Sequence, residues 1–262
     1  GADIAGRIVA VGKNITRFQV GDEVFGAAKG GSGGFAEYVC AQEKSLALKP
    51  TGVSFEEAST ASMAALTALQ GLRDHGKIQS GNRVLIYGAS GGVGTFAVQI
   101  AKSFGAEVTA VCSTRNVDIA RSIGADHVID YTREDFMKGG ELYDLIFVAN
   151  GDVSVSQFKQ ALNPNGICVL AGGGGTSIIQ LLVGMLQEWW ISKTENKKIG
   201  SFLAKINQKD LAFIKELLAS GKVKPVIDRR YRLSETAEAL RYIGEGHAQG
   251  KIVITIEHAS KP

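Results

Sequence analysis

Short apolar runs separated by glycine-rich or polar turns make up the first 50 residues. Residues 8–11 form one such run, residues 22–25 follow the turn at Gly21, and residues 35–40 follow a loop of small residues. Turn signals at intervals of about 8–12 residues are typical of an all-β unit. We therefore expect the chain to begin with a small barrel or sandwich-like domain.

From residue 54 the apolar positions take up helical spacing, and strands then alternate with helices. Residues 55–73 are rich in Ala, Leu and Glu and have helical periodicity. Beyond them the pattern predicts strands at 83–87, 107–112, 127–130, 142–149 and 166–170, and helices at 93–104, 117–123 and 154–162. A helix at 177–192, a strand at 199–206, helices at 210–220 and 234–245 and a last strand at 251–256 follow. Repeated strand–helix–strand units imply an α/β fold with a parallel sheet covered on both faces.

One glycine-rich loop lies between a predicted strand and a predicted helix, in the sequence RVLIYGASGGVG at residues 83–94. Its spacing fits a dinucleotide-binding fingerprint in the frame Ala89-x-Gly91-x-x-Gly94. Glycines let the backbone turn sharply and approach a pyrophosphate, and the helix N-terminus offers free N–H groups to the anion. The alternative is an ordinary tight turn of an α/β protein.

The end of the second strand distinguishes NAD from NADP. NAD-binding proteins place Asp or Glu there for the ribose 2′-hydroxyl, whereas this chain has Ser113, Thr114 and Arg115. A hydroxyl and a guanidinium donate hydrogen bonds to a 2′-phosphate, which favours NADPH. The alternative for Arg115 is a solvated residue at a helix start. Tyr131 ends the next strand and either reaches the same phosphate or caps the sheet.

Two further strand ends lie at the same edge of the predicted sheet. They carry Asn150 with Gly151, and a glycine run that includes Gly172 and Gly173. In open α/β sheets, ligands lie outside the carboxyl ends of the strands. Glycines at these ends would let the nicotinamide half of a dinucleotide lie directly against the backbone. A flexible loop is the alternative for the glycine run.

Composition excludes several other classes of protein. The chain has 33 Gly but only four Pro and is 45% hydrophobic, unlike collagen or a disordered chain. Its charge of +3 comes without a basic block, so no nucleic-acid partner is expected. The apolar stretch at 177–191 is too short for a membrane span of roughly 20 residues. Three distant cysteines and no recognisable targeting peptide indicate a reducing, cytoplasmic location, with an organelle left open.

Blocks spread over essentially the whole chain resemble the medium-chain dehydrogenase/reductases, specifically their zinc-independent NADPH quinone oxidoreductase (zeta-crystallin-like) branch. These blocks are GADIAG at 1–6, VGDEV at 20–24, GFAEY at 34–38, LTA at 66–68, ASGGVG at 89–94, IGAD at 123–126, KPVID at 224–228 and GHAQGK at 246–251. The resemblance implies a GroES-like catalytic domain (1–58 and 208–262) interrupted by a Rossmann domain (59–207).

The same resemblance implies hydride transfer from NADPH to a quinone or an α,β-unsaturated carbonyl, with a homodimer as the default assembly. Backbone groups of Ser90, Gly92 and Val93 would contact the pyrophosphate, and Ser113, Arg115 and Tyr131 the 2′-phosphate. The nicotinamide side would be formed by Thr67, His247, Ala248 and Gln249. For His247 the alternative is an exposed turn residue, and no proton donor is assigned.

Two departures from the wider family concern zinc and length. Zinc-dependent relatives carry a Gly-His-Glu motif, where this chain has Gly1-Ala2-Asp3, and nothing between residues 27 and 37 resembles their four-cysteine lobe. Zinc needs a tight set of S, N or O ligands, so neither site is expected. Family members also carry further N-terminal residues, and we expect this chain to lack that segment of the catalytic domain.

Two other functions remain open from the sequence. An enoyl-thioester (enoyl-CoA) reductase would use the same cofactor site but needs a basic patch for the carrier phosphate, and no distinct one is visible. A cofactor-binding interaction protein with little turnover is the alternative from a different class.

Overall fold

The computed structural model describes residues 1–136, 140–150, 155–171 and 197–256. The chain divides into two compact units, which are Thr67–Ala204 and the combination of Gly1–Leu66 with Lys205–Pro262. We call the first the sheet unit and the second the split unit. Their limits lie near, but not at, the boundaries after residues 58 and 207 that the sequence predicts.

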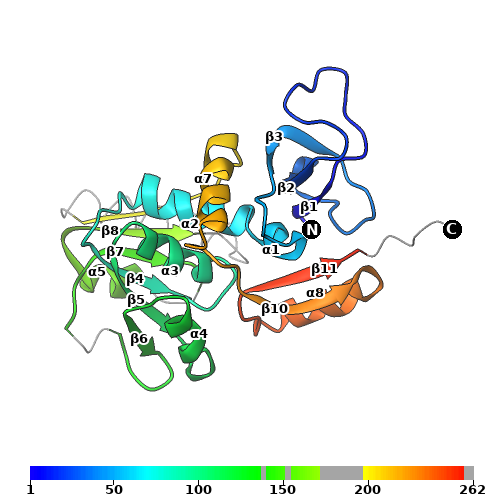
Figure 1. Ribbon diagram of the computed structural model, residues 1–262. Helices are drawn as coiled ribbons and strands as arrows, with labels where there is room; N and C mark the ends of the chain where they lie inside the picture. The colour runs from blue at the N-terminus through cyan, green and yellow to red at the C-terminus, as the bar shows by residue number, and fades with distance from the viewer. Residues whose placement is uncertain (137–139, 151–154, 172–196, 257–262) are drawn as a thin grey trace. The chain divides into compact units, whose positions relative to one another are not determined.

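The sheet unit is built on six parallel strands in the order β6-β5-β4-β7-β8-β9 (Figure 1). The strands are β4 (Arg83–Tyr87), β5 (Glu107–Cys112), β6 (His127–Asp130), β7 (Tyr143–Val148), β8 (Leu162–Ala171) and β9 (Lys198–Phe202). The expected Rossmann-like α/β fold is therefore confirmed. The chain runs outward from β4 to β6 and then returns to β7, on the other side of β4. Connections after β4 and β7 thus leave in opposite directions, which is where open α/β sheets bind ligands.

Three helices connect these strands. They are α3 (Gly94–Ser103), α4 (Val117–Ser122) and α5 (Val155–Gln160). Residues 94–101 of α3 are all buried, as expected for a helix packed on a sheet inside the protein. Because α3 starts directly after the glycine loop, its packing fixes the position of that loop.

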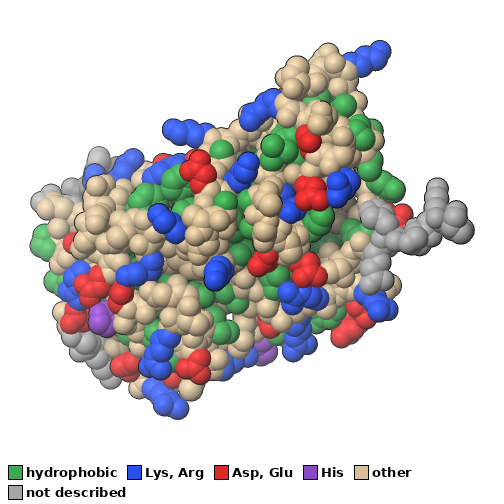
Figure 2. Space-filling view, viewed as in Figure 1, with side chains coloured by type: hydrophobic (Ala, Val, Ile, Leu, Met, Phe, Trp, Pro, Cys, Tyr) green, Lys and Arg blue, Asp and Glu red, His purple; other side chains and the backbone are tan. Residues whose placement is uncertain are grey.

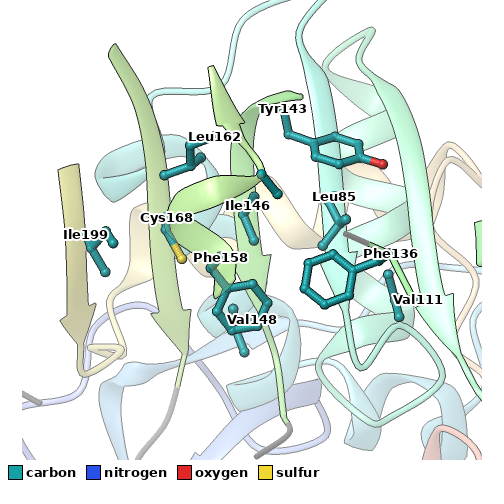
Figure 3. Close-up of a cluster of buried hydrophobic side chains, with 11 residues drawn as sticks. Leu85, Val111, Phe136, Tyr143, Ile146, Val148, Phe158, Leu162, Cys168 and Ile199 are labelled. Carbon is teal, nitrogen blue, oxygen red and sulfur yellow. The ribbon is translucent and has the colours of Figure 1, made fainter. Parts of the chain in front are cut away.

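A row of register-paired side chains forms the core of one sheet face (Figure 3). Leu85 is opposite Ile146, Ile146 is opposite Cys168, and Cys168 is opposite Ile199. Successive residues of a strand face opposite sides, so the row takes one residue each from β4, β7, β8 and β9. Aromatic rings extend it, with Phe136 and Phe158 stacked at 5.7 Å between centroids. These contacts hold the strand ends that carry the candidate site.

The split unit contains a three-stranded antiparallel sheet and a parallel strand pair. The elements are β1 (Asp3–Arg7), β2 (Glu23–Ala28), η1 (Lys29–Gly31), β3 (Ala41–Leu48), α1 (Phe55–Thr60), α7 (Gln208–Ala219), β10 (Ile227–Arg232), η4 (Leu233–Glu235), α8 (Thr236–Gly244) and β11 (Lys251–Thr255). Helix α1 begins with a capping box, in which Ser54 and Glu57 each bond the other's backbone N–H. The described strands of the first 50 residues thus form one sheet.

Asp3 connects three segments of the split unit that are far apart in sequence. Its Oδ1 accepts hydrogen bonds from Ser62 Oγ at 2.6 Å and from the Met63 backbone nitrogen at 3.0 Å. Its Oδ2 lies 3.2 Å from Lys251 Nζ. Because the carboxylate is already held by these donors, the Gly1-Ala2-Asp3 segment has a structural role in this fold.

Several sequence-based predictions of elements were wrong in detail. Residues 8–11 and 35–40 do not form strands. In the second segment Tyr38 is 64% exposed, so its side chain has no sheet surface to pack against. The helix predicted over 55–73 is divided into α1, α2 (Met63–Gln70) and the π-helical η2 (Gly71–His75). The break occurs where the Ser62 hydroxyl lies 2.7 Å from the Gly26 carbonyl oxygen instead of facing solvent. Strand β10 was not foreseen, and the helix predicted at 177–192 lies outside the described residues.

Positive and negative side chains are mixed over the surface. Figure 2 shows Lys and Arg scattered among Asp and Glu on the visible face, with no continuous basic stripe. Among the described residues, no helix has the length and apolar character required to cross a membrane.

Candidate cofactor site

The loop between β4 and α3 turns so tightly that two of its glycines are required. Gly88 has a φ of +77°, and a Cβ there would lie 2.8 Å from the Asn150 carbonyl oxygen. A Cβ on Gly94 would overlap the Gly88 carbonyl oxygen. The Gly91 nitrogen donates to the same oxygen at 3.2 Å, which closes the turn. Glycine at positions 88 and 94 thus follows from close backbone approach.

The opposite side of the same loop is open. A Cβ on Gly91 would meet no atom closer than the Gly88 carbonyl oxygen, at 3.5 Å. Helix α3 has no acidic residue in its first turn and no side-chain cap on its N-terminus. A helix start with these properties accommodates an anion close to the backbone. Ser90, Gly91, Gly92, Val93 and Gly94 therefore provide a surface that fits a pyrophosphate.

The end of β5 continues into a short 3-10 turn, η3 (Thr114–Asn116), that carries the predicted 2′-phosphate residues. Ser113 is half-buried, and Arg115 and Tyr131 are exposed, Tyr131 by 54%. The Tyr131 nitrogen donates to the Cys112 carbonyl oxygen at 3.1 Å, so Tyr131 lies beside the end of β5. The structure thus brings the backbone of Tyr131 next to Ser113.

A buried carboxylate that the sequence reasoning missed lies next to these residues. Asp130 Oδ2 accepts from Thr114 Oγ1 at 2.6 Å, and Asp130 Oδ1 accepts from the Thr132 hydroxyl and nitrogen. Arg133 Nε lies 3.5 Å from Oδ2. The Thr114 hydrogen bond, with those of Thr132, holds the pKa of Asp130 below its usual value. Asp130 is therefore charged, and its oxygens are used by Thr114 and Thr132. In the sequence, its position at the end of a predicted strand was the feature that could have marked it as a site residue.

A buried amide joins the first two loops of the site. Asn116 Nδ2 donates to Ser90 Oγ at 2.8 Å and to Ser113 Oγ at 3.1 Å. The backbone adds to this connection, because the Gly88 and Ala89 nitrogens donate to the Val111 carbonyl oxygen. Sequence reasoning missed Asn116, for which the only signal was its position at the start of a helix.

The remaining predicted residues are distributed over both units. Asn150 is exposed after β7, next to Gly88, whereas Gly172 and Gly173 lie outside the described residues. Thr67 is half-buried on α2 in the sheet unit. His247, Ala248 and Gln249 form the turn before β11 in the split unit, where Asp228 Oδ2 accepts from the Gln249 nitrogen and from Tyr242 Oη, both at 2.9 Å.

Comparison with known proteins identifies the family of this chain. Residues 123–254 match the zinc-binding dehydrogenase family, and residues 1–51 match the alcohol dehydrogenase GroES-like domain. A chloroplastic quinone oxidoreductase, QR1 of Triphysaria versicolor, is 36% identical over 96% of this chain and 78% of its own length. The chain belongs to the medium-chain dehydrogenase/reductases, in their quinone oxidoreductase-like branch.

Two further relatives extend this similarity. The 2-methylene-furan-3-one reductase of Solanum lycopersicum is 36% identical over 97% of this chain and 62% of its own length. The structure of the quinone oxidoreductase from Coxiella burnetii superposes with a TM-score of 0.85 at 29% identity, covering 98% of this chain and 79% of that one. Membership of this family of dehydrogenases makes a nicotinamide dinucleotide the cofactor and a small molecule the substrate.

Metal ligands are the other question that the family raises. Within the described ranges, no three His, Cys, Asp or Glu side chains are grouped so that they could hold a metal ion. The Gly1-Ala2-Asp3 segment, compared above with the Gly-His-Glu motif, contains no histidine, and the Asp3 carboxylate is held by Ser62, Met63 and Lys251.

Proposed function

We propose that this chain is an NADPH-dependent, zinc-independent oxidoreductase that reduces a quinone or an α,β-unsaturated carbonyl compound. The observation that carries the proposal is the pairing of an open glycine loop at the α3 N-terminus with Ser113 and Arg115 at the end of β5. The names of the relatives agree with it, and they include an NADPH-dependent alkenal/one oxidoreductase of Arabidopsis thaliana that is 34% identical.

The choice of NADPH follows from the charges around the adenosine ribose. Arg115 and the Ser113 hydroxyl donate hydrogen bonds to a 2′-phosphate, and Tyr131 completes the group from the end of β6. Asp130, the carboxylate next to Tyr131 at the end of β6, has its oxygens occupied by Thr114 and Thr132. A 2′-phosphate therefore meets donors instead of free carboxylate oxygens.

The remaining protein contribution is positioning. When bound, the nicotinamide supplies a hydride to an electron-poor carbon of the substrate, and a proton from water or a hydroxyl completes the reduction. Ser90, Gly91, Gly92, Val93 and Gly94 hold the pyrophosphate. For the nicotinamide side, we keep the residues that the sequence predicts: Thr67, Asn150, Gly172, Gly173, His247, Ala248 and Gln249.

Independence from zinc is part of the same proposal. It rests on the donor set, since Ala2 cannot ligate a metal and Asp3 is bonded to its own fold. Turnover is therefore expected to survive exhaustive treatment with a strong chelator. Restoration of lost turnover by added Zn²⁺ would contradict this part.

Assembly and location complete the proposal. A homodimer is expected, and sedimentation tests it. A reducing compartment is expected because none of Cys40, Cys112 and Cys168 is part of a disulfide. Relatives carry chloroplastic and mitochondrial designations, so fractionation of cells should examine organelles as well as cytoplasm.

The test of the cofactor assignment is a comparison of Kd values for NADPH and NADH. Arg115→Asp should weaken NADPH by about 10- to 100-fold, the value of one or two charge-assisted hydrogen bonds, and leave NADH nearly unchanged. Arg121→Asp, an exposed charge reversal on α4, is the matched control. Equal effects of Arg115→Asp on both dinucleotides would contradict the assignment.

A further inference from the structure

Asn116 is a buried side chain whose hydrogen bonds are directed entirely at two serines. It is 5% exposed, and its Nδ2 donates one hydrogen to Ser90 Oγ and the other to Ser113 Oγ. Ser90 belongs to the loop after β4, and Ser113 to the loop after β5. One amide group thus joins the two loops that the proposed function assigns to two different phosphates.

The orientation of this amide follows from the cost of unpaired groups. Among the described residues, Asn116 Oδ1 is one of two buried side-chain oxygens without a hydrogen-bond partner. A flipped amide would bury two unpaired N–H hydrogens in place of one unpaired acceptor. The observed orientation, with Nδ2 toward both serines, is therefore the one of lower energy.

This orientation determines what the serines can do. Each serine oxygen accepts a hydrogen from Asn116, so its own hydroxyl hydrogen remains available to donate. Within the described chain, no protein acceptor receives a hydrogen bond from Ser90 Oγ or Ser113 Oγ. Both hydroxyls thus keep a hydrogen to donate, Ser90 as a buried side chain and Ser113 as a half-buried one, in the two loops where anions are expected.

We propose that Asn116 is a positioning residue that sets the hydroxyls of Ser90 and Ser113 as donors to the pyrophosphate and the 2′-phosphate of the cofactor. The inference rests on the proposed function, because it assumes a phosphorylated dinucleotide in this site. It adds a role for the Ser90 side chain and makes one buried amide responsible for both phosphate contacts.

Two near-isosteric variants separate the donor role of Asn116 from its packing. Asn116→Leu removes the donor, and Asn116→Asp replaces it with an acceptor that draws the serine hydrogens inward. The probes are NADH, which has the pyrophosphate alone, adenosine 2′-monophosphate, which has the 2′-phosphate alone, and NADPH. Asn116→Leu should weaken NADH and the 2′-monophosphate by about 5- to 10-fold each, and Asn116→Asp should weaken both more strongly.

Double variants show whether the serines carry the effect. In a Ser90→Ala background, Asn116→Leu should weaken NADH no further, and in a Ser113→Ala background it should weaken the 2′-monophosphate no further. Additive losses in both backgrounds would overturn the proposal, as would a loss confined to one probe. A general disturbance of the fold would produce that additive pattern, because it would weaken both probes in every background.

The matched control is Asn163→Ala. Asn163 Nδ2 donates to Asp144 Oδ1 at 2.8 Å at the amino end of β8, the opposite edge of the sheet from the loops. It should leave all three affinities unchanged. If the wild-type protein binds none of the probes, the proposed function itself is overturned. If the wild-type protein binds NADPH and the Asn116 variants bind it equally well, only this inference is overturned.

Discussion

Asp228 Oδ2 lies 2.9 Å from the backbone nitrogen of Gln249 and accepts its hydrogen bond. The same oxygen accepts from Tyr242 Oη, and this bond raises the pKa of Tyr242 above its usual value, which keeps the phenol protonated as a donor. A cation–π contact adds to the cluster, with the Arg229 guanidinium 3.8 Å from the Tyr242 ring centroid. The turn at residues 247–249 is therefore held by a side chain of β10.

Asp228→Ala should release this turn, because the Gln249 nitrogen and the Tyr242 hydroxyl both lose their acceptor. We expect the free energy of unfolding to fall by about 1–3 kcal/mol and kcat/KM for NADPH to fall about tenfold. Tyr242→Phe, which leaves the Gln249 bond in place, should have a smaller effect on kcat/KM. Equal effects of the two substitutions on kcat/KM would show that the hydrogen bond from Gln249 to Asp228 does not hold the turn.

The Asp130 carboxylate predicts a pH-dependent contribution to stability. Hydrogen bonds, first of all that of Thr114, lower its pKa in the folded state below the usual 3.8. A depressed pKa stabilises the fold above pH 3.8, and this contribution disappears as the pH falls through the folded-state value. Thr114→Val should therefore destabilise the protein at neutral pH and approach wild-type stability in strong acid. Urea unfolding at a series of pH values measures this difference, and a difference constant with pH would contradict it.

The three cysteines should differ in reactivity. Cys40 is exposed and Cys112 and Cys168 are buried. Burial, and then the Asp130 carboxylate, raises the pKa of Cys112 to about 11, so almost no thiolate forms at neutral pH. Iodoacetamide should label Cys40 quickly and the other two only after unfolding, as mass spectrometry of the peptides would show. Cys40→Ser should remove the rapid labelling.

The glycine loop gives a steric prediction. Gly94→Ala places a Cβ on the Gly88 carbonyl oxygen, so the turn must shift. We expect a loss of about 1–3 kcal/mol in the free energy of unfolding and at least tenfold weaker binding of NADPH. Gly200→Ala in β9 is the matched control, because no atom lies within 4 Å of a Cβ at that position. It should change neither quantity measurably.

The parallel sheet could be predicted from the sequence because its strands are local apolar runs. The buried residues 84–86 of β4 are all apolar, and the buried residues 108–112 of β5 are apolar except for Thr109, as expected for strands covered on both faces. Strand β10 was missed because three of its six residues are arginine and only Tyr231 is buried. The helix is interrupted at Ser62, beside the bond from the Met63 nitrogen to Asp3, which lies sixty positions earlier in the chain. Local periodicity carries no information about such a distant partner.

The candidate site divides in the same way. The glycine loop could be recognised because its chemistry lies within one short segment, and Ser113 and Arg115 followed by counting along the next strand. Asn116 and Asp130 could not be assigned, because their roles depend on partners in other loops, Ser90 and Thr114. Hydrogen bonds between loops depend on the tertiary structure, and the spacing of residues in one sequence does not reveal them.

Turnover with a panel of acceptors measures the proposed activity most directly. The loss of NADPH absorbance is followed with a para-quinone, an alkenal and an enoyl-CoA, and again with NADH as the donor. We predict turnover of the quinone or the alkenal, with kcat/KM at least about tenfold higher for NADPH than for NADH. Turnover of the enoyl-CoA alone would indicate an enoyl-thioester reductase instead. NADPH that binds without turnover of any acceptor would contradict the assignment as a reductase.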